Sequence, residues 1–205
     1  MADFKDILKN ISGNKIYIQT HNFPDPDAIS SAFGLQRLLQ YESIEAKIIY
    51  TGEIDRLSTI SMIKKLNIDI HRIDSLPEIL KDDEIILVDA QRGNSNITDT
   101  CSDRVLCIDH HRIFGQSQYG YSDIRPDVGA CASIIAEYYK EAGIAPDPDV
   151  CTALLYGIKI DTANLTRSVS KLDLDMFYDL YYKADLELIS KLETSTLQLS
   201  DLHAY

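Results

Sequence analysis

Acidic and histidine side chains directly follow several apolar runs of this chain, and this pattern constrains its fold more than any other feature. The segments are His21–Asp27 after the run 15–20, Asp89 after the run 85–88, Asp109–His111 after the run 105–108, and Asp161 after a hydrophobic segment ending at Ile160. A charged residue at the polar end of a buried strand packs poorly but projects well into a crevice at the carboxyl edge of a sheet. We therefore expect these side chains to converge at strand ends and to bind divalent cations and phosphate.

Apolar spacing along the chain alternates between the periods of strands and helices, which predicts an α/β fold. Strands are expected at 15–20, 46–50, 68–71, 85–89 and 105–108. Helices are expected at 28–39, 59–66, 129–142, 148–159, from about 170 to 183, and from 185 to about 199. Because parallel neighbours need crossover connections, this order favours a doubly wound, mostly parallel sheet flanked by helices, followed by a helical C-terminal half.

The composition restricts the partners that the chain can hold. Its formal net charge is −12 and its isoelectric point is about 4.7. A protein that holds long nucleic acid by its surface needs clustered Lys and Arg, so we do not expect binding of long duplexes. No apolar run approaches the ~18 residues of a membrane span, and the first residues do not resemble a secretory leader. We expect a cytoplasmic protein without a membrane partner.

Each candidate residue also has an ordinary structural interpretation. Asp25 and Asp27 could cap the helix that follows them, because Asp is favoured at helix N-termini. Asp89 and Asp161 could be turn residues, and His110 could be a polar residue at a strand end. Any one of these interpretations is reasonable alone, but the occurrence of all these residues in one chain favours a metal site.

The residues also resemble those of a known family, the DHH phosphoesterases. The matching motifs are His21-Asn22-Phe23-Pro24-Asp25-Pro26-Asp27, Leu87-Val88-Asp89, Asp109-His110-His111 and Gly157-Ile158-Lys159-Ile160-Asp161-Thr162. This family includes RecJ exonucleases, family-II inorganic pyrophosphatases and the oligoribonuclease/pAp-phosphatase (nanoRNase) proteins. Four motifs in order make the resemblance specific, whereas a lone Asp-His-His would be weak evidence.

The resemblance implies two divalent metal ions held by six side chains. His21 and Asp25 would hold one ion, Asp27 and His110 the other, and Asp89 and Asp161 would bridge both. Oxygen and imidazole ligands without thiolate suit Mn²⁺, which we favour, with Mg²⁺, Co²⁺ or Fe²⁺ as substitutes. A hydroxide bridging the two ions would attack phosphorus.

The resemblance also suggests roles for residues that do not bind metal. His111 resembles the residue that contacts the substrate phosphate or protonates the leaving oxygen. Asp109 alternates away from His110 along an extended backbone, so we expect it to orient a ligand imidazole as part of the catalytic machinery. Arg167 and Arg112 lie near motifs and could grip phosphate through their guanidinium groups.

Three functions remain open from the sequence. The leading one is a manganese-dependent phosphoesterase that hydrolyses short oligonucleotides or 3′-phosphonucleotides of the pAp type. The second is an inorganic pyrophosphatase, and the third is a non-catalytic module that binds metal or nucleotide. We expect residues 1–184 to form the catalytic domain and residues 185–205 a linker helix or tail towards a C-terminal domain that is absent, because no Gly-Gly-Gly-His run is present. A homodimer is compatible with this organisation.

Overall fold

Six parallel strands form one sheet in the computed structural model, which describes residues 4–12, 14–113 and 118–194. Their order across the sheet is β3-β2-β1-β4-β5-β6, and every hydrogen-bonded neighbour is parallel. The strands are β1 (Ile16–Gln19), β2 (Ala46–Tyr50), β3 (Ile70–Arg72), β4 (Glu84–Val88), β5 (Arg104–Asp109) and β6 (Tyr121–Ile124). The strand order reverses between β1 and β4, and ligands of such sheets bind at this point, beyond the carboxyl ends of the strands.

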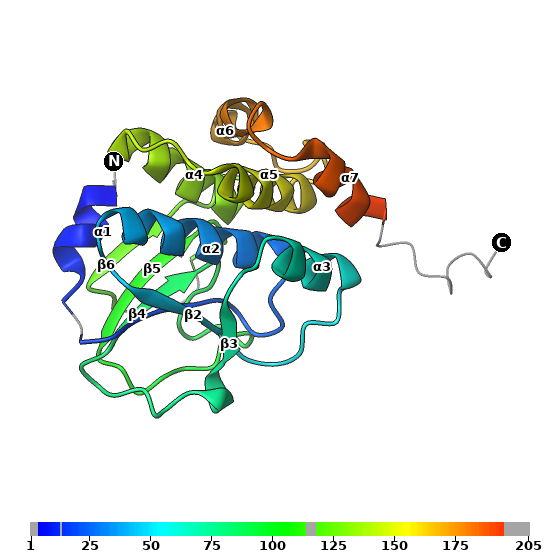
Figure 1. Cartoon of the computed structure of the whole chain (residues 1–205). Helices are drawn as coiled ribbons and strands as arrows, with labels where there is room; N and C mark the ends of the chain where they lie inside the picture. The colour runs from blue at the N-terminus through cyan, green and yellow to red at the C-terminus, as the bar shows by residue number, and fades with distance from the viewer. Residues whose placement is uncertain (1–3, 13, 114–117, 195–205) are drawn as a thin grey trace.

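The α-helices of the described residues are stacked on one face of the sheet (Figure 1). They are α1 (Phe4–Asn10), α2 (Pro26–Tyr41), α3 (Leu57–Lys65), α4 (Cys131–Ala142), α5 (Pro148–Asp161), α6 (Lys171–Tyr181) and α7 (Leu186–Thr194). Helix α2 contacts β1, β2 and β4, while α5 packs on α2 and α4. Strand residues such as Ile18, Ile86 and Ile108 share one buried cluster with these helices.

The opposite face of the sheet is covered by the segments that join β3 to β4 and β4 to β5. A second buried cluster lies there, formed by Tyr17, Ile49, Ile79, Ile85, Leu87, Val105 and Cys107. Within the described ranges, the helical part of this cover is a single 3-10 turn, η1 (Ile73–Ser75). The sheet is therefore buried on both sides, as all-parallel sheets require, although its two covers differ in kind.

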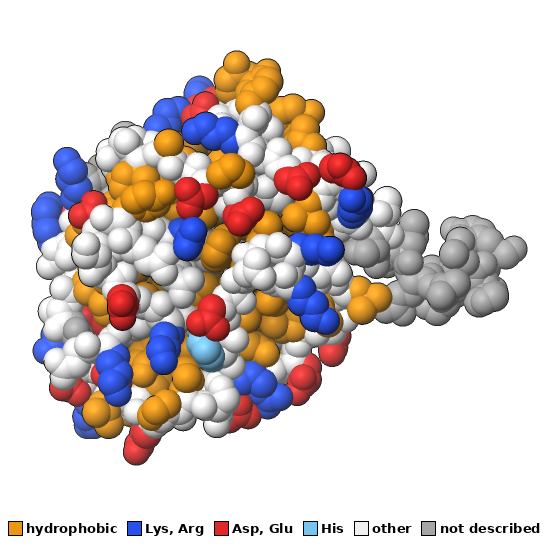
Figure 2. Space-filling view, in the orientation of Figure 1, with side chains coloured by type: hydrophobic (Ala, Val, Ile, Leu, Met, Phe, Trp, Pro, Cys, Tyr) orange, Lys and Arg blue, Asp and Glu red, His pale blue; other side chains and the backbone are white. Residues whose placement is uncertain are grey.

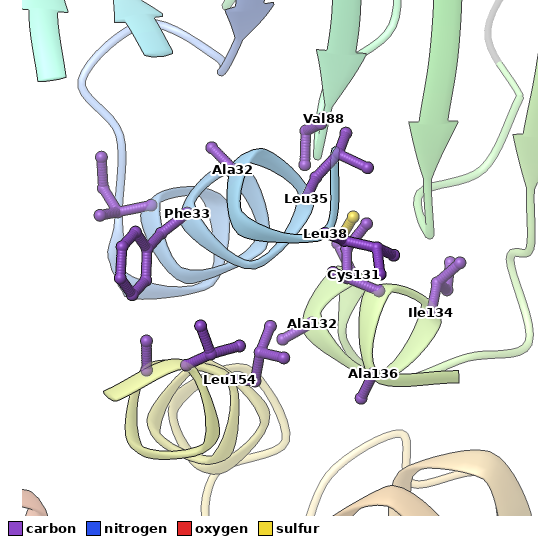
Figure 3. Packing of buried hydrophobic residues seen from close by; sticks show 14 of the residues in the cluster. Ala32, Phe33, Leu35, Leu38, Val88, Cys131, Ala132, Ile134, Ala136 and Leu154 are labelled. Carbon is purple, nitrogen blue, oxygen red and sulfur yellow. The ribbon is translucent and has the colours of Figure 1, made fainter. Parts of the chain in front are cut away.

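The packing of α2 against α4 and α5 brings three helices together beside the crevice. Figure 3 shows Leu35 of α2, Ala132 of α4 and Leu154 of α5 in this region, with Val88 reaching it from the end of β4. Gly157 makes the approach of α5 close. A Cβ at this position would lie only 2.2 Å from the Oγ atom of Ser30 on α2. A larger residue would therefore push apart the helices that border the crevice.

The α/β prediction is confirmed, and the sheet is wholly parallel. Two elements were not predicted, α1 and β6, because each is short and β6 alternates weakly, with Ser122 exposed and Asp123 buried. Helix α7 was expected to run to about residue 199, but residues 195–199 lie outside the described ranges. Its side chains Ile189 and Leu192 are buried in the main core.

Two surface properties bear on the expected partners. Figure 2 shows Lys and Arg side chains scattered among Asp and Glu on the face in view, without a continuous basic stripe. Among the described residues, no helix is both long and apolar enough to cross a membrane.

Candidate metal centre

Three of the four sequence motifs lie at the carboxyl edge of neighbouring strands. The segment His21–Asp27 follows β1, Asp89 follows β4, and Asp109–His111 lies at the end of β5. Because β1, β4 and β5 are adjacent in the sheet, the residues that follow them meet over the crevice. The pattern of apolar runs ending in acids and histidines therefore predicted correctly that these three motifs lie together at strand ends.

The fourth motif does not lie at a strand end, which corrects our expectation. Asp161 is the last residue of α5, so the apolar run before it is the buried side of a helix. The chain then turns through three consecutive left-handed residues, Ala163, Asn164 and Leu165, with φ values of 48°, 55° and 61°. Such conformations cost about 1–3 kcal/mol each for residues with side chains. The Asp161 carboxylate thus sits at the start of a strained turn.

A first group of ligand atoms joins His21, Asp25 and Asp89, all within 4.8 Å of one another. The Nε2 atom of His21 lies 3.6 Å from Asp89 Oδ2 and 3.9 Å from Asp25 Oδ1. The other ring nitrogen of His21, Nδ1, lies 2.8 Å from the carbonyl oxygen of Asn22 and donates its hydrogen there. This bond fixes the tautomer that leaves Nε2 free to bind a cation.

A second group joins Asp27, His110 and Asp161. The Nε2 atom of His110 lies 3.4 Å from Asp161 Oδ2, 3.8 Å from Asp27 Oδ2 and 3.3 Å from Asp89 Oδ1. Its Nδ1 atom lies 3.1 Å from the carbonyl oxygen of Val128. Both histidines therefore have the arrangement common among metal-bound imidazoles, in which one nitrogen donates to a backbone carbonyl and the other faces the ion.

Asp25 and Asp27 both have structural roles as helix caps, but only Asp25 caps the helix that follows it, as the sequence suggested. The Oδ1 atom of Asp25 accepts hydrogen bonds from the amides of Asp27 and Ala28, at 2.9 and 3.1 Å, and caps α2. Asp27 accepts hydrogen bonds from the amides of Cys131 and Ala132, at 2.7 and 3.0 Å. Those amides begin α4, whose own N-cap residue is an alanine without a capping side chain. Asp27 therefore caps a helix that is distant in sequence.

The crowding of carboxylates leaves a deficit of positive charge at this place. Burial raises the pKa of Asp27 well above its ordinary value, and the Asp89 carboxylate raises it further. Burial likewise raises the pKa values of Asp89 and Asp161, although the neighbouring His110 opposes this effect. Buried acids that cannot ionise together are stabilised as carboxylates when cations lie between them.

The pKa values of the two histidines are also raised, but here the cause is the neighbouring carboxylates and not burial. Burial alone would lower the pKa of His21, but the Asp25 and Asp89 carboxylates outweigh it and raise the value to about 9. The carboxylates of Asp89, Asp27 and Asp161 overcome burial in the same way at His110 and raise its pKa to about 10. Protons on the two rings thus partly replace a positive charge that the acids require.

Asp89 supplies the sharpest test of whether the residues fit a metal. It is 3% exposed, and its Oδ1 atom accepts no hydrogen bond of ordinary geometry from the described residues, although His110 Nε2 and His111 Nδ1 lie 3.3 and 3.5 Å from it. Its backbone is left-handed, with φ 58°, which is uncommon for a residue with a side chain. A buried, unsatisfied carboxylate oxygen held by a strained backbone fits a cation that bonds to it. Both ligand groups share or adjoin Asp89, so the donor set fits two ions.

The chemistry of the donors restricts which metals fit. Carboxylate oxygens and imidazole nitrogens suit Mn²⁺, Mg²⁺ and related cations, whereas a thiolate would favour zinc. Cys131 lies close to the acids, but burial raises the pKa of its thiol well above the ordinary value, and Asp89 and Asp27 raise it further. This thiol therefore stays protonated and is a poor ligand.

His111 forms a third candidate ligand group with Asp89 and His110, but its Nδ1 atom, unlike those of His21 and His110, faces a carboxylate. Its Nδ1 atom lies 2.9 Å from Asp109 Oδ1, and the hydrogen bond to Asp109 raises the pKa of His111. Asp109 is fully buried, and the hydrogen bonds from His111 and Gln91 outweigh burial and lower its pKa. Asp109 thus orients the imidazole of His111, whereas we expected it to orient a metal ligand.

Gln91 is a functional residue that the sequence did not reveal. Its Nε2 atom donates to Asp109 Oδ2 at 2.6 Å and lies 3.2 Å from the carbonyl oxygens of His111 and Arg112. The side chain is buried, so it fixes both the Asp109 carboxylate and the loop that follows β5. Its position two residues after Asp89 was the available signal, but glutamine carries no chemistry that marks it.

The two arginines expected to contact phosphate are placed differently. Arg167 donates from Nη2 to the carbonyl oxygen of Asp161 at 2.7 Å, and the same atom lies 3.9 Å from Asp161 Oδ1. Its side chain is 65% exposed, so a guanidinium is available at the edge of the second ligand group. Arg112 is exposed on the loop after β5, where its carbonyl accepts from Gln91. The contact of either residue with phosphate stays a prediction.

A cavity of about 450 Å³ opens beside His111. Its lining consists of Asp89, Ala90, Gly93, Asn94, Ser95, Asn96 and His111. This volume lies within the ~300–1,000 Å³ typical of small-molecule sites. The cavity thus places a ligand-sized space against the histidine and the shared carboxylate.

Comparison with known proteins agrees with this geometry. Residues 15–158 match the family model described as DHH family, N-terminal domain. An uncharacterised protein of Methanocaldococcus jannaschii is 33% identical over 178 residues, or 87% of this chain and 37% of its own length. A probable manganese-dependent inorganic pyrophosphatase of Bacillus licheniformis is 33% identical over 152 residues, or 73% of this chain and 48% of its own length. The chain belongs to the DHH family and spans less than half of either relative.

Solved structures share the fold. A Methanococcus jannaschii protein described as a candidate family II inorganic pyrophosphatase superposes with a TM-score of 0.69 at 26% identity, over 87% of this chain and 60% of that one. An exopolyphosphatase-related protein of Bacteroides fragilis gives a TM-score of 0.73 at 20% identity, over 93% of this chain and 59% of that one. The second likeness supports the fold alone.

Proposed function

We propose that the chain is the catalytic part of a phosphohydrolase that depends on divalent metal, with Mn²⁺ as the favoured ion. The observation that carries the proposal is the convergence of two ligand groups on Asp89, whose buried Oδ1 atom lacks a hydrogen bond from the described residues. The Bacillus licheniformis relative is described as a probable manganese-dependent inorganic pyrophosphatase, which supports the choice of metal.

Six of the residues would bind the cations, and His111 would transfer a proton. His21, Asp25 and Asp89 would hold one ion, and Asp27, His110 and Asp161 the other, with Asp89 next to both. The bridging of both ions by Asp161, which the family resemblance implies, stays a prediction. When bound, such a pair of ions supplies Lewis-acid stabilisation of phosphoryl oxygens and lowers the pKa of water. The hydrogen bonds from the histidine Nδ1 atoms to backbone carbonyls keep the imidazoles in the metal-binding tautomer.

His111 is suited to protonate the leaving oxygen of the substrate. Its Nδ1 atom is engaged by Asp109, so Nε2 is the ring nitrogen that can exchange a proton with a bound molecule. The hydrogen bond to Asp109 raises the pKa of His111, which favours the charged imidazole that a general acid requires. Asp109 and Gln91 act as positioning residues that hold this ring at the cavity.

The substrate of the proposed reaction is a small phosphorylated molecule. We favour short oligonucleotides or 3′-phosphonucleotides, because the segment Pro24-Asp25-Pro26-Asp27 resembles that branch of the family. Inorganic pyrophosphate is the second candidate, because relatives of this chain are described as inorganic pyrophosphatases. Residues 185–205 would link this unit to a further domain; their described part, α7, packs on α3 and α5.

Hydrolysis with and without metal tests the proposal. The chelated protein should not hydrolyse a chromogenic phosphodiester, a dinucleotide or pyrophosphate, and Mn²⁺ should restore turnover of at least one of them. Product analysis by ³¹P NMR then ranks the substrates. Absence of metal-dependent turnover on all three, in protein that binds Mn²⁺, would favour the non-catalytic module.

A further inference from the structure

Phe23 has features that its place between two metal-binding residues does not require. Its side chain is 63% exposed, and its backbone adopts φ 56°. Positive φ is a genuine outlier for a bulky residue, and an exposed phenylalanine leaves apolar surface in water. Strain of this kind persists where the surrounding structure enforces it, commonly at functional sites.

The surrounding structure holds the Phe23 ring in a fixed place. The amide of Phe23 donates to the carbonyl oxygen of Thr51 at 2.9 Å, which ties the loop to the end of β2. The ring lies against Gly52, where an added Cβ would come within 2.6 Å of ring atom Cδ1. Gly52 itself has φ 90°, so a residue without a side chain is required there for two reasons. The exposed ring is therefore preorganised.

The loop that carries Phe23 is bonded directly to the wall of the cavity beside His111. The amide of Asn22 donates to the carbonyl oxygen of Asn96 at 2.6 Å, and the side chains of Asn22 and Thr98 are joined by a hydrogen bond of 3.1 Å. These contacts place Phe23 and residues 93–96 on adjacent loops, and the Phe23 ring lies next to the cavity without being among the residues that line it.

The cavity wall offers neutral hydrogen-bonding groups and little positive charge. The side chains of Asn94, Ser95 and Asn96 are not engaged by other described side chains or backbone groups. The described residues that line the cavity include no Lys or Arg. A second phosphoryl group would call for cationic partners, whereas a sugar or a heterocyclic base is recognised by amide and hydroxyl groups.

We propose that Phe23 and the Asn94–Asn96 segment form a subsite for the aromatic organic part of a phosphoester, such as a nucleobase stacked on the Phe23 ring. The inference rests on the proposed function, since it assigns the specificity of the same site. It also separates the two candidate substrates, because pyrophosphate has no group that this subsite could hold.

Equilibrium binding tests the subsite independently of turnover. The probes are adenosine 5′-monophosphate and ribose 5-phosphate, titrated into the Mg²⁺-loaded protein and followed by ¹H NMR. Stacking on an aromatic side chain is worth enough that the wild type should bind the nucleotide about tenfold more tightly than the sugar phosphate. The base protons should shift upfield through the ring current of Phe23. Asn94→Ala should weaken the binding of adenosine 5′-monophosphate and leave the binding of ribose 5-phosphate unchanged.

Variants of the ring provide the decisive comparison. Phe23→Ala should remove the tenfold preference and the upfield shift, and Phe23→Tyr should retain both. Phe23→Gly, which suits φ 56°, replaces the alanine variant if that one does not fold. Tyr182→Ala is the matched control, because this tyrosine is 76% exposed on the distant end of α6.

These experiments distinguish a failure of the proposed subsite from a failure of the proposed function. Equal affinity of the wild type for the two probes, or an equal loss of both in Phe23→Ala, overturns the subsite. If the same protein still hydrolyses pyrophosphate with Mn²⁺, the proposed function stands without it. A nucleotide preference that depends on Phe23, in protein without metal-dependent turnover, keeps the subsite and refutes the enzyme.

Discussion

The ligands from strand ends and the ligand from a helix end are held by different kinds of support. Among the ligands that follow strands, Asp27 and Asp89 are 1% and 3% exposed, whereas the side chain of Asp25 is 40% exposed; the side chain of Asp161, at the end of α5, is 26% exposed. The strand-end ligands are fixed by sheet hydrogen bonds and buried helix amides. Asp161 precedes three left-handed residues and an exposed arginine.

This difference indicates that the two halves of the site tolerate change unequally. Buried groups with several fixed contacts cannot relax when one of them is altered, because the interior is close-packed. A carboxylate on a strained, partly exposed turn can shift at small cost. The buried ligands Asp27 and Asp89 should therefore determine whether metal binds. Asp161, at the end of α5, should affect only how tightly the second ion is held.

The largest effect is expected from Asp89→Asn, which removes a carboxylate that belongs to the first ligand group and lies 3.3 Å from His110 of the second. Turnover should fall by about 10²–10³-fold or more, the loss typical when one electrostatic group at a reacting centre is removed. Metal analysis after dialysis should show that both ions are lost. Asp55→Asn, an exposed acid with no described partner, is the control and should behave as wild type. Two tightly held ions in Asp89→Asn would show that the residue is not shared.

The second prediction concerns pH and separates metal-free from metal-loaded protein. His21 and His110 have folded-state pKa values of about 9 and about 10, above the ordinary ~6.5 of histidine. Their contribution to the stability of the metal-free protein is complete below pH ~6.5 and is lost as pH rises through these values. Metal binding must displace the same protons, so metal affinity should fall about tenfold per pH unit per proton as pH is lowered.

Thermal unfolding at several pH values measures both trends. The melting temperature of the metal-free protein should fall between pH 7 and 9, and the stabilisation produced by Mn²⁺ should grow over the same range. Replacement of His110 by Gln should flatten both dependences. Parallel pH curves with and without metal would show that the ions do not bind at these imidazoles.

A smaller effect is expected from Asp161→Asn, which tests the helix-end half. It removes one member of the second ligand group and leaves His21, Asp25 and Asp89 unchanged. Affinity for one ion should fall by on the order of 10–100-fold, comparable with the loss of a supporting residue at a metal site. Titration of Mn²⁺ by electron paramagnetic resonance should show one tight and one weakened site. Loss of both ions, as in Asp89→Asn, would contradict the proposed inequality of the two halves.

The smallest effect is expected from Gly157→Ala, which acts through packing. The new Cβ would meet Ser30 Oγ, with Ala132 Cβ and Asp27 Oδ1 both at 3.1 Å. Overpacking of this kind costs about 1–3 kcal/mol of the free energy of unfolding. Denaturant unfolding measures it, and the double variant with Ser30→Ala should recover part of the loss. An unchanged midpoint would show that α2 and α5 can separate freely.

The sequence predicted the strand-end half better than the helix-end half for a physical reason. Apolar runs that end in Asp89 or Asp109 are short enough to be strands, and parallel strands bring their carboxyl ends together. The helix expected at 148–159 is present, but the expectation that Asp161 follows a strand treated the run before it like the runs before Asp89 and Asp109. The fourth motif identified Asp161 as a candidate ligand, but it did not predict that Asp161 lies at the end of a helix.

Other parts of the site depend on contacts that no local pattern encodes. The roles of Gln91 and Phe23 arise from partners on other loops, Asp109 and Gly52. The capping of α4 by Asp27 joins residues that are more than a hundred positions apart. Such contacts follow from tertiary packing, and only the three-dimensional structure reveals them.

The contact between Asp27 and α4 gives the Asp27 carboxylate two roles, because it caps a helix and is also a candidate metal ligand. Any cation that draws electron density from Asp27 weakens its bonds to the amides of Cys131 and Ala132, and any loosening of α4 shifts a metal ligand. Hydrogen exchange at those two amides would therefore report the occupancy of the site from inside the helical layer. Replacement of Asp27 would remove a helix cap and a candidate ligand together. Loss of activity in such a variant would therefore not by itself show that Asp27 takes part in the reaction.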